Sequence, residues 1–124
     1  MRGNSMQLLL LANEPPEDFA LRENKEKFDS YMGEWYAYSE KMKPVTRNSA
    51  ALETPAAATV VSVRNGKRQV EDGPYADAKE QLGGFFIIDV LDLDAGAEWA
   101  AQCPAAKSGF VDVRVIPSHE EHAK

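Results

Sequence analysis

The chain has 124 residues, of which 44% are apolar and 27% are charged, and its formal net charge is −6. These values are typical of one globular domain that can bury a core without disulfides. They exclude a basic nucleic-acid surface, which needs clustered Lys and Arg. No apolar run reaches the ~18 residues that a membrane helix requires, so no membrane partner is expected. The single cysteine, Cys103, cannot form an internal disulfide, which fits a reducing, cytoplasmic compartment, and we expect it to be a buried thiol.

The first half of the chain predicts a strand followed by helix. Residues 1–5 are expected to be a disordered leader, residues 6–117 a single domain and residues 118–124 a charged tail. The apolar run at residues 6–12 predicts a buried strand. Residues 17–42 predict one long helix or two pieces, because large apolar residues recur at three- and four-residue spacing: Phe28, Tyr31, Met32, Trp35, Tyr38 and Met42.

The second half predicts four or more strands and one helix. A short strand is expected near residues 45–47, and residues 58–64 and 67–71 form a hairpin around Asn65-Gly66, with the return strand at an exposed edge. Residues 84–90 are apolar enough for a central strand. Asp92 or Asp94 can cap a helix that runs to about Cys103, and residues 110–116 alternate like a strand.

This order predicts an α+β protein with a ferredoxin-like split βαβ arrangement, in which two helices cover one face of an antiparallel sheet. On the last strand, Phe110 and Ile116 flank Asp112 and Arg114, which is too apolar for an open surface. A second copy packed sheet to sheet would cover this face, so a homodimer is expected.

The stretch from Asp72 to Phe86 is the candidate site, because long loops with charged and Gly-Pro positions are often functional. Asp72 is either a general base or a residue that hydrogen-bonds its own turn. Tyr75 either donates to a ligand or packs at a pocket mouth, and Lys79 either binds an anion or pairs with a neighbouring acid. Arg114 either pairs with an acid or binds an anion. The pocket would lie between this loop and the helix residues Trp35 and Tyr38, although packing against a sheet is the commoner explanation of such an aromatic stripe.

Several segments together resemble the YCII-related family in its DGPF-domain branch: Asp72-Gly73-Pro74-Tyr75, then residues 79–85, Glu98-Trp99 and the terminal strand. The resemblance covers residues 6–117 and implies a dimeric α+β barrel. It implies little about activity, although some relatives are small enzymes acting on chlorinated hydroquinones. The family also has a proposed His-Asp pair. Here Asp72 is present, but both histidines, His119 and His122, lie on the tail, so that pair is not available in the core unless the tail folds back.

Two functions therefore stand at this point. One is a small-molecule-binding protein that acts without cofactor or metal, by proton transfer or elimination if it is an enzyme. The other is a non-catalytic dimeric interaction protein linked to transcriptional regulation. The charged tail offers too few ligands for a metal site.

Overall fold

The computed structural model describes residues 5–118. The predicted leader and tail, with His119 and His122, lie wholly or mainly outside these residues. The elements, in chain order, are β1 (Met6–Glu14), α1 (Pro16–Leu21), α2 (Phe28–Met42), β2 (Thr46–Ala51), the short 3-10 helix η1 (Pro55–Ala57), β3 (Thr59–Arg64), β4 (Lys67–Asp72), β5 (Gln81–Val90), α3 (Leu93–Ala101), α4 (Ala105–Ser108) and β6 (Phe110–Ile116).

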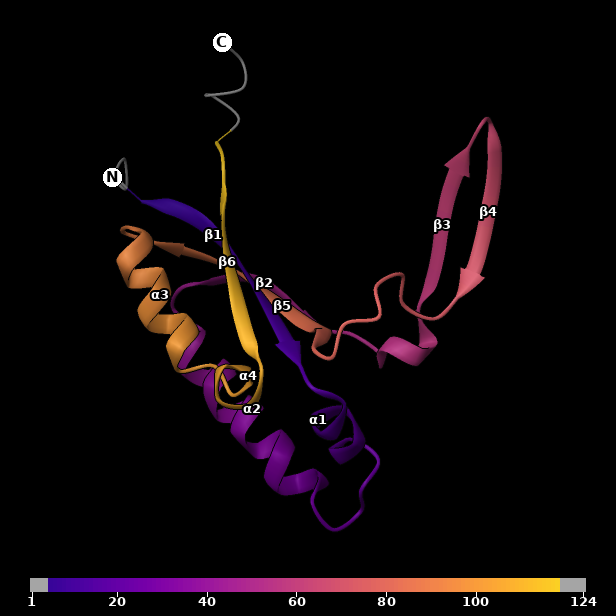
Figure 1. Ribbon diagram of the computed structural model, residues 1–124. Coiled ribbons are helices and arrows are strands. Elements are labelled where there is room, and N and C mark those ends of the chain that lie inside the picture. Colours follow the sequence, from indigo (N-terminus) through magenta and orange to yellow (C-terminus); the bar gives the residue numbers. More distant parts are fainter. Residues whose placement is uncertain (1–4, 119–124) are drawn as a thin grey trace.

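The main sheet has the strand order β2-β5-β1-β6, and every neighbouring pair is antiparallel. Helices α2 and α3 lie on the same side of this sheet (Figure 1). Two βαβ units that interlock in this way define the ferredoxin-like arrangement, so the predicted α+β fold class is confirmed.

The core lies between the sheet and these helices. Leu8 and Leu10 of β1, Ile88 of β5 and Met42 of α2 are all almost fully buried. Alternation along β1 places Leu9 and Leu11 on the opposite face, where they are only partly covered. We call this second side of the sheet the open face.

The predicted helix over residues 17–42 is two helices, which was one of the two alternatives. Asn24 separates them, because its side-chain Oδ1 accepts hydrogen bonds from the backbone N–H groups of Glu26 and Lys27. The later helix begins where predicted, since Asp92 accepts from the N–H of Ala95 at 2.9 Å. It ends at Ala101 rather than Cys103, before the separate short helix α4.

The predicted hairpin forms and its return strand is exposed as predicted, but the hairpin is separate from the main sheet. Within residues 5–118, β3 and β4 pair only with each other, and residues 59–72, here called the arm, stand away from the main sheet (Figure 1). Asn65 and Gly66 both have positive φ, as the tight turn requires. Since β5 begins at Gln81, the predicted long loop is reduced to residues 73–80.

Candidate functional site

A cavity of about 310 Å³ lies between α2 and the end of the sheet formed by β2 and β5. Its walls are mostly apolar, with Phe28, Met32, Trp35, Tyr36 and Phe86 among the lining residues. Polar side chains also line it, among them Glu14, Arg22 and Tyr31 at one end and the hydroxyl groups of Ser39 and Ser49 elsewhere. An apolar cavity with a few convergent polar groups is the usual form of a small-molecule site.

Glu14 reaches this cavity because it is the last residue of β1 on the helix side of the sheet. It continues the buried alternation of Leu8, Leu10 and Ala12, and only 1% of its surface is exposed. Its carboxylate Oε1 accepts a hydrogen bond from the hydroxyl of Tyr31 on α2. A carboxylate buried to this degree is rare unless it is paired.

Arg22, just after α1, supplies the pairing charge. Its Nη2 lies 3.6 Å from Oε2 of Glu14 and donates to the carbonyl oxygen of Gly83 at 3.2 Å. Its Nη1 donates to the carbonyl oxygen of Leu52, and its guanidinium lies 5.0 Å from the centroid of the Phe19 ring. The Arg22 guanidinium therefore has a structural role, because it donates to backbone carbonyl oxygens and pairs with Glu14.

Burial dominates the electrostatics of this site. Desolvation raises the pKa of Glu14 above its ordinary value, although the Tyr31 hydrogen bond and the Arg22 charge oppose the shift. Desolvation and the neighbouring Glu14 likewise raise the pKa of Tyr31, so its hydroxyl stays a proton donor. A carboxyl group with a raised pKa in a cleft is a candidate acid or base.

The double glycine at the start of β5 lets the backbone approach this site. A Cβ placed on Gly83 would overlap Oε2 of Glu14 and lie 3.1 Å from Cε1 of Phe19. A Cβ on Gly84 would lie 3.0 Å from the carbonyl oxygen of Ala50 on β2. The glycines are thus explained by close packing beneath the cavity.

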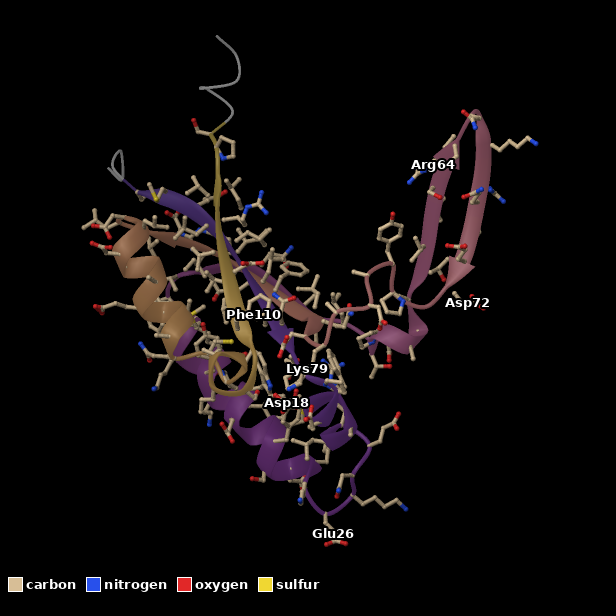
Figure 2. All side chains as sticks on the ribbon, viewed as in Figure 1. Asp18, Glu26, Arg64, Asp72, Lys79 and Phe110 are labelled. Atoms are coloured by element: carbon tan, nitrogen blue, oxygen red, sulfur yellow. The ribbon has the colours of Figure 1, made fainter. Side chains whose placement is uncertain are left out.

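The structure brings together few of the residues predicted for the site. Trp35 lines the cavity, whereas Tyr38 is 3% exposed in the core and donates to the carbonyl oxygen of Trp99 at 2.9 Å. Asp72 is exposed at the foot of the arm (Figure 2). Tyr75 and Lys79 are exposed on the following loop, and none of these three lines the cavity.

The remaining predicted side chains also sit apart from the cavity. Arg114 is exposed on the open face, opposite Leu9 of β1, and among residues 5–118 it forms no ion pair with Asp112. Cys103 is 2% exposed, and burial raises the pKa of its thiol to about 11, so the predicted buried thiol is confirmed.

Sequence reasoning missed Glu14 and Arg22 and named Tyr31 only as one member of the helical stripe. A partial signal was available for Glu14, since alternation places it on the same face as Leu8, Leu10 and Ala12. A carboxylate on the buried face of a strand needs a partner, and that requirement points to a site. Arg22 carried no comparable signal, because the two helices separate at a turn just beyond it.

Two further findings concern metal ligands and membrane-spanning helices in the described part of the chain. Residues 5–118 contain no group of three His, Cys, Asp or Glu side chains placed to hold a metal ion. The helices of the same part include none that is both long and apolar enough to span a membrane.

These features define a class: a ferredoxin-like α+β protein with a buried carboxyl group at the polar end of an apolar cavity. The chain belongs to the YCII-related family, since the model of the YCII-related domain matches residues 6–119. It is also 38% identical over 83 residues to an uncharacterised protein of Rhizobium meliloti. That match covers 65% of this chain and 64% of the relative. The finer assignment to the DGPF branch stays a prediction.

Proposed function

We propose that the protein binds a small, uncharged and largely apolar molecule in the cavity and exchanges a proton with it through Glu14. The observation that carries this proposal is the burial of Glu14. Burial raises the pKa of its carboxyl group toward neutral pH. A general acid or base works best when its pKa lies near the working pH.

The charges around the cavity favour an uncharged ligand. When Glu14 is ionised, Arg22 balances its charge, and the guanidinium donates in addition to the carbonyl oxygens of Leu52 and Gly83. An anionic ligand would have to draw donors away from these oxygens, and a cationic one would meet a carboxylate that is already paired. The apolar walls, including Trp35 and Phe86, suit a ring or a branched hydrocarbon.

The chemistry that fits is proton transfer within the ligand. Glu14 would take a proton from an activated C–H or O–H group, the bonding pair would move into a double bond, and the proton would return at another atom. Such an isomerisation only moves a proton and an electron pair within the ligand, so it needs no cofactor or co-reactant. Tyr31 would act by holding the Glu14 carboxylate in place through its hydroxyl, and it would stabilise the ionised form.

The test is a thermal-shift screen with uncharged aromatic and alicyclic compounds that carry one hydroxyl or carbonyl group. The screen compares wild type with Glu14→Gln and with Asp72→Asn, which changes a carboxylate outside the cavity. A ligand stabilises a protein only by binding the native state preferentially. The proposal expects hits on wild type that Glu14→Gln weakens and Asp72→Asn leaves unchanged. Hits lost in Asp72→Asn but kept in Glu14→Gln would move the site to the arm.

We also propose that the protein is a homodimer that associates through the open face. Leu9, Leu11, Phe85 and Ile87 are only partly covered there, and Phe110 is 45% exposed. Arg114 lies among these side chains, where a second copy could supply an acid to pair with it.

The alternative function, a non-catalytic interaction protein, is favoured by one observation. The arm and the following loop expose large apolar side chains, of which Tyr75 is the most exposed at 77%. If no compound stabilises the protein in the screen, this surface, with Asp72 and Lys79 beside it, is the next candidate for function.

A further inference from the structure

The arm is a two-stranded hairpin with three valines on one face, which they share with Thr59, Arg68 and Asp72. Residues 59–72 pair in continuous register, from Thr59 opposite Asp72 to Arg64 opposite Lys67. Val61 lies directly opposite Val70, and Val63 shares their face by alternation. These three side chains are 60%, 53% and 60% exposed, in the order Val61, Val70 and Val63.

The other face of the arm is polar apart from Val60, which is partly covered. Ser62 lies opposite Gln69, and their side chains are joined by a 3.4 Å hydrogen bond. A lone two-stranded hairpin is marginal in water, whereas a hairpin with its apolar face covered is stable. The arm therefore has the pattern of an element that is covered on its valine face.

The position of the arm indicates what covers it. The arm rises on the side of the sheet opposite α2 and α3, which is the side of the open face (Figure 1). Figure 2 shows Arg64 near its tip and Asp72 at its foot, so the arm projects along its length from the body of the subunit. A second copy that packs on the open face would occupy the same side of the molecule.

The area required by a stable dimer supports this occupant. The main sheet has four strands of about eight residues each, and at ~4.8 Å between strands and ~3.3 Å per residue its open face measures roughly 500 Å². A standard interface buries ~800 Å² on each partner, so the sheet alone falls short. The arm strands have 6 residues each, and each arm face measures roughly 200 Å². In a symmetric pair each subunit gives one arm face and receives another, which brings the area to roughly 900 Å².

We propose that the arms are exchanged in the dimer: the valine face of each arm, formed by Val61, Val63 and Val70, packs on the partner subunit. This proposal rests on the homodimer proposed above and adds the arm residues to its interface. It is independent of the Glu14 cavity.

The test compares one substitution on each face of the arm by sedimentation equilibrium. Val63→Glu places a carboxylate on the valine face opposite Arg68, so the charge is matched within the hairpin and the hairpin itself should persist. Ser62→Glu places the same charge on the polar face and is the matched control. Exchange of the arms predicts that Val63→Glu raises the dimer Kd about tenfold or more, because a charge would enter an apolar contact. Ser62→Glu should change Kd by no more than about twofold.

Each other outcome has a defined meaning. A monomeric wild type at all concentrations would refute the homodimer and the arm exchange together. A dimeric wild type with equal Kd for both variants would refute arm exchange and leave a dimer through the open face. Hydrogen exchange on the wild type gives a second readout that needs no substitution. Arm amides from 59 to 72 should lose protection on dilution below Kd, and protection that does not change with concentration would overturn the proposal.

Discussion

Replacement of Gly83 by alanine tests the packing beneath the cavity most sharply. The φ angle of Gly83 is not in the left-handed region, so the backbone itself would accept alanine. At such a site Gly→Ala stabilises by about 0.4–1 kcal/mol, because the unfolded chain loses freedom. Here the new Cβ would overlap Glu14 Oε2 and press on Phe19, whose Cε1 and Cζ would lie 3.1 and 3.2 Å away. The carboxylate cannot move aside without breaking its bonds to Tyr31 and Arg22.

Overpacking of this kind costs about 1–3 kcal/mol, so the clash outweighs the entropic gain. We expect Gly83→Ala to lower the free energy of unfolding by about 1–2 kcal/mol in urea titrations and the Tm by about 5 °C. Gly33→Ala on α2 is the matched control, since no atom lies within 4 Å of its added Cβ. That control should gain about 0.5–1 kcal/mol, because glycine weakens a helix interior.

A double-mutant cycle assigns the clash to Glu14. Removal of the carboxylate in Glu14→Ala should relieve part of the cost of Gly83→Ala, with a coupling energy of about 1 kcal/mol or more. A Gly83→Ala protein at least as stable as wild type, measured beside a stabilised Gly33→Ala, would refute the packing described for this site.

Three further predictions concern titratable groups. Tyr31→Phe should cost about 1–3 kcal/mol at pH 7 in urea unfolding, because buried Glu14 would lose a donor; an unchanged midpoint would contradict this. Burial raises the pKa of Glu14, so the native state holds its proton more tightly than the unfolded chain does. Relative to Glu14→Gln, wild type should therefore be most stable below the ordinary pKa of 4.5 and lose stability as pH rises through the folded pKa; parallel stability curves would count against it. Native Cys103, with a thiol pKa of about 11 and 2% exposure, should resist iodoacetamide at pH 8 and react after unfolding; rapid native labelling would show that the thiol is accessible.

The strands were predictable because their signals are local. Continuous apolar runs located β1 and β5, alternation located β6, and Asn65-Gly66 located the hairpin turn. Local signals do not show where a hairpin packs, so the separation of the arm from the main sheet was not predicted. Local signals also predicted the Gly-Pro turn after Asp72. They did not show that the loop following it lies away from the cavity.

The candidate site could be predicted only in part, because it is assembled by tertiary structure. Trp35 was found from the helical stripe of α2. Glu14, Arg22 and Tyr31 come from the end of β1, the end of α1 and the first turn of α2, and only the folded chain brings their side chains together. Alternation places Glu14 on the same face as Leu8, Leu10 and Ala12, but the continuous apolar run of residues 8–12 does not show which face of β1 is buried.

The measurement that tests the central claim most directly is an NMR titration of the side-chain carboxyl carbon of Glu14, with assignment from Glu14→Gln. Burial in the cavity predicts a midpoint above 4.5, and a further rise in Tyr31→Phe, because the Tyr31 hydrogen bond lowers this pKa. A midpoint at or below 4.5, unchanged in Tyr31→Phe, would contradict a buried, proton-exchanging Glu14.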